Sequence, residues 1–198
     1  DCLIHSNVCI YDNTVIGHNV TIHSGAILGA DAFYYKNRPD KFDKLLSGGN
    51  VVIEDFVDIG ALCTIDKGVT ASTIIKEGTK IDNQVQIGHN CIINENTIIA
   101  GCVGIAGSAV IGKNCKIFPG AVIAATPQDL KFDGEYSTVH IGDGTTIREF
   151  VTINRGTKDR EKTVIGKNCM IMAYCHFAHD CIVGDHVITS NNTQVAGH

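Results

Sequence analysis

The chain has 198 residues with 16 basic and 21 acidic side chains, a formal net charge of −5. This acidic excess argues against nucleic acid as a partner, because phosphate backbones attract basic faces. No apolar run approaches the roughly 18 residues of a membrane-spanning helix, so no integral membrane segment is expected. No secretory leader is recognisable, and nine cysteines without paired or metal-ligand spacing favour a reducing cytoplasm.

A period of six residues predicts the fold. An aliphatic residue recurs at every sixth position over long stretches, and the run across 75–123 is unbroken. Neither a helix nor a single strand has a period of six. Three six-residue sides form a coil of about 18 residues in a parallel β-helix. The sequence therefore predicts one all-β domain over 1–198, in which the first and fifth positions of each hexad point inward.

Three polar segments interrupt this period and are expected to be loops that leave the β-helix at its corners: 33–50, 129–140 and 157–162. Loops on a rigid scaffold commonly carry function. The second loop is expected to leave about two coils below His179 and to carry Asp129 and Lys131 toward a groove. The chain stops inside a hexad, so we expect either a truncated chain or ends that other copies cover.

Six of the cysteines occupy the inward fifth position of a hexad, which predicts small buried apolar side chains rather than nucleophiles or metal ligands. They are Cys63, Cys91, Cys115, Cys169, Cys175 and Cys181.

Three histidines hold the outward third position of a hexad, namely His18, His89 and His179. An outward histidine is commonly a solvated surface residue, and His18 has no further feature. Twelve hexads, or four coils, separate His89 from His179, which places them on the same face about 19 Å apart. His179 is followed by Asp180, and a histidine beside a carboxylate is suited to general-base chemistry.

A metal site is the alternative for the C-terminal histidines. Zinc would need three converging ligands, and the candidates are His176, His179 and His198. Their places in the hexads differ, with His176 in the sixth place and His179 in the third, so no metal is expected.

Residues from about 16 to 115 resemble UDP-3-O-acylglucosamine N-acyltransferases. The matching stretches are LGADAFYY, GGNVVIEDFVDIG, CTIDKG, KIDNQVQIGHN and IAGCVGIAGSAVIGKNC. By this resemblance His89 is a general base, and Asp82, Asn83 and Gln86 belong to the same substrate-binding motif.

Residues from about 116 to 198 instead resemble UDP-N-acetylglucosamine O-acyltransferases. The matching stretches are TPQDLKFDGE, IGDGTTIRE, VTINRGT, CHFAHDC and QVAGH. The resemblance implies that His179 is the base, that Asp180 orients it and that the Gly197 N–H stabilises an oxyanion. It further implies substrate-binding roles for Gln128, Asp129, Lys131, His176 and His198.

Together the resemblances imply a left-handed β-helix and a cytoplasmic homotrimer of a Gram-negative-type bacterium. The implied reaction belongs to early lipid A biosynthesis, where a 3-hydroxyacyl chain passes from acyl carrier protein to a UDP-glucosamine-type sugar nucleotide. The carrier thioester is a co-substrate, and no cofactor is expected. Two alternatives stay open: an inactive or engineered chimeric scaffold fragment, and another hexapeptide-repeat enzyme that uses acetyl-CoA.

Overall fold

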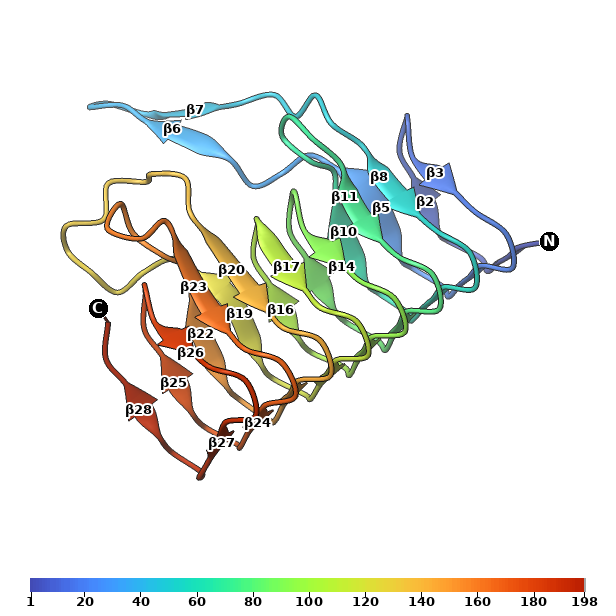
Figure 1. Ribbon diagram of the computed structural model, residues 1–198. Coiled ribbons are helices and arrows are strands. Elements are labelled where there is room, and N and C mark those ends of the chain that lie inside the picture. The colour runs from blue at the N-terminus through green and yellow to red at the C-terminus, as the bar shows by residue number, and fades with distance from the viewer. Residues whose placement is uncertain (198) are drawn as a thin grey trace.

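The computed structural model describes residues 1–197, and their regular structure is β-strand throughout (Figure 1). As the six-residue period predicts, the chain forms a parallel β-helix of about nine turns, and it is left-handed, as the resemblance implies. Three parallel sheets run along it and are called faces A, B and C, in the order in which each turn visits them. The described residues contain no helix able to cross a membrane.

The strands of the three faces stack in chain order. Face A contains β1 (Leu3–Ile4), β4 (Thr21–Ile22), β9 (Asp58–Ile59), β12 (Lys80–Ile81), β15 (Ile98–Ile99), β18 (Lys116–Ile117), β21 (Thr146–Ile147), β24 (Met170–Ile171) and β27 (Ile188–Thr189). Face B contains β2 (Cys9–Ile10), β5 (Ile27–Ala30), β10 (Thr64–Asp66), β13 (Gln86–Ile87), β16 (Gly104–Ile105), β19 (Val122–Ala125), β22 (Thr152–Asn154), β25 (His176–Phe177) and β28 (Gln194–Val195). Face C contains β3 (Val15–Ile16), β8 (Val51–Ile53), β11 (Thr73–Ile75), β14 (Ile92–Ile93), β17 (Ala109–Ile111), β20 (Thr138–Ile141), β23 (Lys162–Ile165) and β26 (Ile182–Val183).

The core is a set of stacked columns of aliphatic residues. Ile81 pairs with Ile59 below it and Ile99 above it, and all three are buried. The six fifth-position cysteines are buried free thiols, as predicted. Burial raises the pKa of the Cys91 thiol to about 12 and that of Cys115 to about 11. These thiols stay protonated at neutral pH, which agrees with a packing role.

All the insertions leave the β-helix at one corner, where the chain passes from face B to face C. They lie between β5 and β8, β10 and β11, β19 and β20, and β22 and β23. The first contains an antiparallel hairpin, β6 (Tyr35–Asn37) with β7 (Phe42–Lys44), inside the segment expected to be a loop. Residues 138–140 belong to strand β20 and Lys162 belongs to strand β23. The loops expected at 129–140 and 157–162 therefore end earlier than the sequence indicated.

Candidate active site

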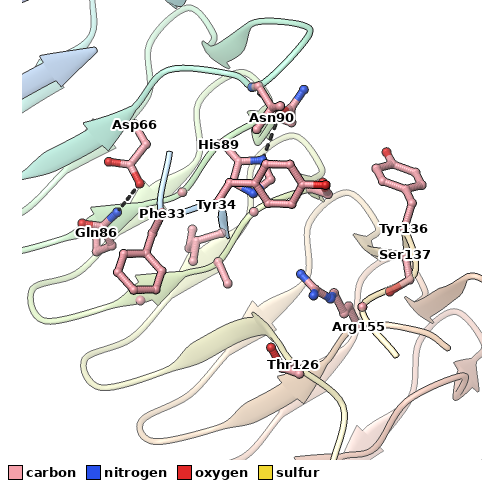
Figure 2. A pocket seen from close by; sticks show the side chains of 18 of the residues that line it. Phe33, Tyr34, Asp66, Gln86, His89, Asn90, Thr126, Tyr136, Ser137 and Arg155 are labelled. Carbon is pink, nitrogen blue, oxygen red and sulfur yellow. Dashed lines mark hydrogen bonds between the residues drawn. The ribbon is translucent and has the colours of Figure 1, made fainter. Parts of the chain in front are cut away.

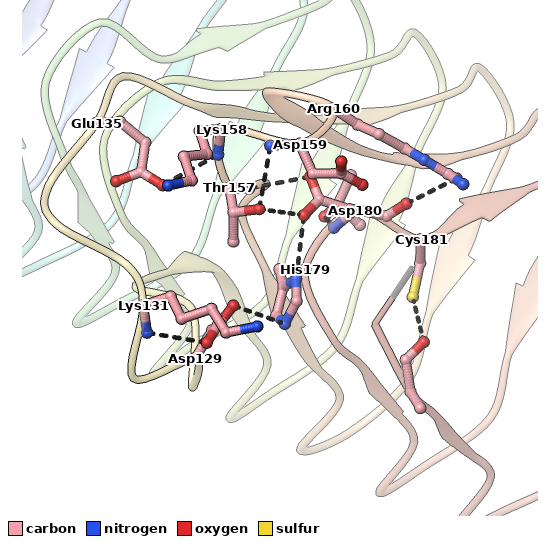
Figure 3. A network of polar contacts seen from close by, with 12 residues as sticks. Asp129, Lys131, Glu135, Thr157, Lys158, Asp159, Arg160, His179, Asp180 and Cys181 are labelled. Atoms are coloured by element: carbon pink, nitrogen blue, oxygen red, sulfur yellow. Dashed lines mark hydrogen bonds and ion pairs between the residues drawn. The ribbon is translucent and has the colours of Figure 1, made fainter.

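His179 lies at the B–C corner directly after β25 and is held by the residue that follows it (Figure 3). Its Nδ1 lies 3.0 Å from Asp180 Oδ2. Asp180 adopts a left-handed backbone conformation with φ 62°, which short polar residues tolerate at turns. A charged carboxylate only accepts hydrogen bonds, so it fixes the proton of the neutral ring on Nδ1 and leaves the lone pair on Nε2.

Asp180 is a buried carboxylate that neighbouring groups keep charged. Thr157 donates its N–H to Oδ1 at 2.9 Å and its hydroxyl to Oδ2 at 2.5 Å. The Asp180 N–H donates to Thr163 Oγ1 at 2.9 Å. Burial opposes the charge of Asp180, but the hydrogen bonds from Thr157 and His179 outweigh it and hold the pKa of the carboxyl below its usual value.

The Nε2 side of His179 faces a second carboxylate and a glycine. Asp129 Oδ2, from the loop after β19, lies 4.0 Å from Nε2. The Lys131 N–H donates to Asp129 Oδ1 at 2.9 Å, so the loop itself holds this acid in place. A Cβ at Gly197 would lie 2.6 Å from His179 Cε1. The ring therefore packs directly on backbone of the next coil, and a side chain at position 197 would displace it.

The other residues predicted for this site differ in their position and exposure. His176 lies on β25, where its Nδ1 is 2.7 Å from Thr152 Oγ1, and burial lowers its pKa. Gln128 is exposed at the start of the loop that carries Asp129. His198 lies outside the described residues. Among residues 1–197, no three His, Cys, Asp or Glu side chains gather closely enough to hold a metal ion.

His89 is held in the same way as His179. Its Nδ1 lies 2.9 Å from Asn90 Oδ1, and Asn90 also has a left-handed backbone, with φ 58°. Asn90 Oδ1 accepts the Val69 N–H at 2.9 Å, and the Asn90 N–H donates to Thr73 Oγ1 at 2.9 Å. A Cβ at Gly107 would lie 2.5 Å from His89 Nε2. Each contact matches one made around His179.

The two histidines belong to two units of like construction. Strands β13 and β25 are four rungs apart on face B, as the hexad count predicts. We call 27–90 the N-terminal unit and 122–180 the C-terminal unit. Each consists of a coil with a long insertion, a coil with a short one and a coil that ends in the histidine. His18 lies at a different corner, with its side chain 80% exposed.

A cleft of about 600 Å³ opens beside His89 (Figure 2). Both long insertions contribute to it, through Tyr34 from the first and Tyr136 from the second. Gln86 also lines the cleft, where its amide donates to Asp66 Oδ2 at 3.1 Å. Its lining does not include Asp82 or Asn83.

Asp82 and Asn83 lie at the preceding corner, between faces A and B. Their side chains accept backbone N–H groups of adjacent coils, Gly101 at 3.2 Å and Ala61 at 2.7 Å respectively. These contacts join coils together. The substrate-binding role implied for these two residues therefore draws no support from the cleft.

Asp66 is a half-buried acid whose charge is costly in this cleft. Burial raises the pKa of its carboxyl to about 6, and the hydrogen bond from Gln86 opposes this only in part. An unfolded aspartate has a pKa near 4, so the folded chain binds more protons between pH 4 and 6. Stability is therefore lost as pH rises through this window.

Asp66→Asn is expected to stabilise the protein above pH 6, since the amide keeps the Gln86 contact without a charge. The gain is about 1 kcal/mol at pH 8, after discounting the shift for partial exposure, and it disappears near pH 4. Asn154 already occupies the equivalent position in the C-terminal unit. Thermal unfolding at both pH values measures the difference. Destabilisation at pH 8, or an equal shift at both pH values, would contradict this account.

Several residues of both sites are not evident from the hexad period. They are Asp66, Gly107, Arg155, Thr157 and Thr163. Aligning the two units with each other reveals Asp66 and Arg155, because TIDK at 64–67 matches TINR at 152–155 just as GHN at 88–90 matches AHD at 178–180. Gly107, Thr157 and Thr163 lie outside these matching stretches.

More than half of the chain, over 1–33, 72–107 and 162–197, matches the family described as "Bacterial transferase hexapeptide (six repeats)". The UDP-3-O-acylglucosamine N-acyltransferase of Wolinella succinogenes is 45% identical over 148 residues, which are 74% of this chain and 43% of that protein. The acyl-[acyl-carrier-protein]–UDP-N-acetylglucosamine O-acyltransferase of Thermodesulfovibrio yellowstonii is 45% identical over 134 residues, 64% of this chain and 52% of that one. This chain thus spans about half, or less, of the curated relatives it matches.

A solved UDP-N-acetylglucosamine acyltransferase from Bacteroides fragilis superposes with a TM-score of 0.53 and 30% identity. The match covers 98% of this chain and 53% of that one. These relatives confirm the resemblance to both kinds of acyltransferase; the boundary near residue 115 stays a prediction. The chain belongs to the bacterial transferase hexapeptide family.

Proposed function

We propose that this chain transfers a 3-hydroxyacyl group from acyl carrier protein to a UDP-glucosamine-type sugar nucleotide, with His179 as general base. The observation that carries the proposal is the orientation of His179. Its Nδ1 is held by the buried, charged Asp180, and its Nε2 faces the loop that bears Asp129. The carrier protein and the sugar nucleotide belong to the proposal and are supported by the names of the relatives. A homotrimeric assembly belongs to it through the resemblance alone.

In the proposed reaction, His179 Nε2 takes the proton of the acceptor hydroxyl as its oxygen attacks the thioester carbonyl. Asp180 stabilises the imidazolium that forms. The Gly197 N–H, on the backbone against which the ring packs, supplies a hydrogen bond to the oxyanion of the tetrahedral intermediate. When the intermediate collapses, the carbon–sulfur bond breaks, and the imidazolium returns its proton to the leaving thiolate. The products are an ester and the free carrier thiol, with no acyl-enzyme.

The test is a transfer assay with 3-hydroxyacyl carrier protein as donor and UDP-N-acetylglucosamine as acceptor, followed by mass spectrometry of the product. An acylated sugar nucleotide is the expected result. A folded protein that forms no product with this acceptor or with UDP-3-O-acylglucosamine would favour the alternative of an inactive scaffold. Turnover with acetyl-CoA in place of the carrier protein would favour the other alternative.

A second transfer site at His89 is favoured by the matching construction of that corner. The cleft of about 600 Å³ beside His89 gives an acceptor room to bind. Asn90 replaces the aspartate, so an imidazolium at His89 would donate its Nδ1–H to the neutral amide oxygen of Asn90 instead of to a charged carboxylate.

We expect His89 to serve the acceptor with the more nucleophilic atom, the amine of UDP-3-O-acylglucosamine. His89→Ala should then abolish amide formation and leave ester formation on UDP-N-acetylglucosamine unchanged. Amide formation that survives in His89→Ala would exclude His89 as the base.

A further inference from the structure

The cleft beside His89 contains a cation, Arg155, that makes no ion pair with a carboxylate of residues 1–197. Arg155 follows β22 and lines the cleft, with its Cζ 5.2 Å from the ring centroid of Phe132. Its Nε is buried and has no hydrogen-bond partner among residues 1–197. The hydroxyl of Ser137, which lines the same cleft, is also buried and without a partner in the described chain. Figure 2 shows Arg155, Ser137 and Thr126 on the same side of the cleft.

The N-terminal unit shows how the equivalent cation is neutralised. Lys67 occupies the position of Arg155, since the N–H groups of both donate to matching carbonyls, on β5 and β19 respectively. Lys67 Nζ lies 3.0 Å from Asp31 Oδ1, at the end of β5. The residue that matches Asp31 after β19 is Thr126. The C-terminal unit has therefore kept the cation and lacks its internal counter-ion.

The two acids that line the cleft, Asp66 and Glu135, make no ion pair with Arg155 among residues 1–197. Glu135 lines the cleft, but its carboxylate oxygens accept the N–H groups of Asp133 at 2.9 Å and Lys158 at 3.0 Å. Those bonds hold the loop after β19 together. A partly buried guanidinium with an unused donor is costly unless another anion satisfies it.

We propose that Arg155 and Ser137 form a subsite that binds a phosphate group of a substrate in this cleft. The planar guanidinium offers paired donors that match phosphate oxygens, and the hydroxyl of Ser137 adds a third. The identity of the ligand rests on the proposed function, because both proposed substrates carry phosphate. The sugar nucleotide has a diphosphate, and the prosthetic group of the carrier protein has a phosphodiester.

The experiment measures binding to the full chain by titration calorimetry, with UDP, 4′-phosphopantetheine and inorganic phosphate as separate probes. Arg155→Gln is expected to lower the affinity for the probe that binds by at least about tenfold. Thr126→Asp places a carboxylate at the position that matches Asp31 and should lower the affinity for the probe by a similar factor. Thr126→Asn adds the same volume without charge, so the difference between the two variants isolates the charge. Lys67→Gln removes the equivalent cation of the N-terminal unit and should leave the affinity unchanged.

If Arg155→Gln and Thr126→Asp lose affinity only for UDP, the subsite binds the sugar nucleotide. If they lose affinity only for 4′-phosphopantetheine, it binds the prosthetic group of the carrier protein. Equal affinity in wild type, Arg155→Gln and Thr126→Asp, with circular dichroism showing all three folded, would overturn the proposal. Failure of the proposed function is separable from this result. If probe binding depends on Arg155 but no acyl transfer occurs, the proposed function fails and the subsite stands. If acyl transfer occurs but its KM and the probe affinity are unchanged in Arg155→Gln, the subsite alone is excluded.

Discussion

His179→Ala is expected to lower the kcat/KM for acyl transfer to UDP-N-acetylglucosamine by about 10³-fold, within the range that a positioned base contributes. Without the imidazole no group of the dyad can take the acceptor proton, and the Asp180 carboxylate loses the ring it orients. The fold should persist, because the His179 side chain lies at a corner and outside the stacked core. Initial rates over a range of acceptor concentrations give kcat and KM separately, and the loss should fall mainly on kcat.

His18→Ala is the matched control. It removes a histidine from the same third place of a hexad, but at another corner and with its side chain 80% exposed. Its rate should equal that of wild type. A His179→Ala protein that retains more than about a tenth of the wild-type rate would exclude His179 as the base.

Phe177→Ala is expected to destabilise the protein by about 3–5 kcal/mol. Phe177 is 1% exposed, and it stacks between Ile153 and Val195 on the inner side of face B. Truncation leaves a cavity that the coils on either side cannot close, because both are fixed by strand pairing. Denaturant unfolding followed by circular dichroism measures the change in midpoint.

Two further variants limit the interpretation of this result. Phe177→Leu retains most of the volume and should cost less than about 1.5 kcal/mol. Phe42→Ala removes the same side chain from the hairpin, where it is 72% exposed, and should leave the midpoint nearly unchanged. If Phe42→Ala and Phe177→Ala had equal effects, the inward orientation of the first hexad position would be wrong.

The β-helix is predictable from the sequence because its backbone follows the same path every six residues. Each coil must present an aliphatic residue to the core at the same place, so Ile81, Ile87 and Ile93 specify three faces of one turn. The burial of Cys63 and its five counterparts follows from the same rule. Handedness does not follow from the period, and here it came from resemblance. The β6–β7 hairpin was also missed, since its alternation is too short to distinguish from a loop.

The candidate site was predictable to a lesser extent. Counting hexads placed His89 and His179 on one face, and the adjacent Asp180 indicated its partner. Thr157 donates the hydrogen bonds that keep the Asp180 carboxylate charged, and Thr163 accepts the Asp180 N–H. These two threonines lie in and after an insertion of irregular length. Insertions break the period, so sequence spacing no longer reports position in space there. Arg155 was missed for the same reason, because its lack of an internal counter-ion shows only when position 126 is matched with Asp31.

The most direct test of the account is the rate of acyl transfer by the double variant His89→Ala/His179→Ala, measured with both UDP-sugar acceptors. The account predicts no ester and no amide above the uncatalysed rate. It also predicts that His89→Ala alone retains ester formation and that His179→Ala alone retains amide formation. Turnover of either acceptor by the folded double variant would contradict the central claim that these two corner histidines are the bases.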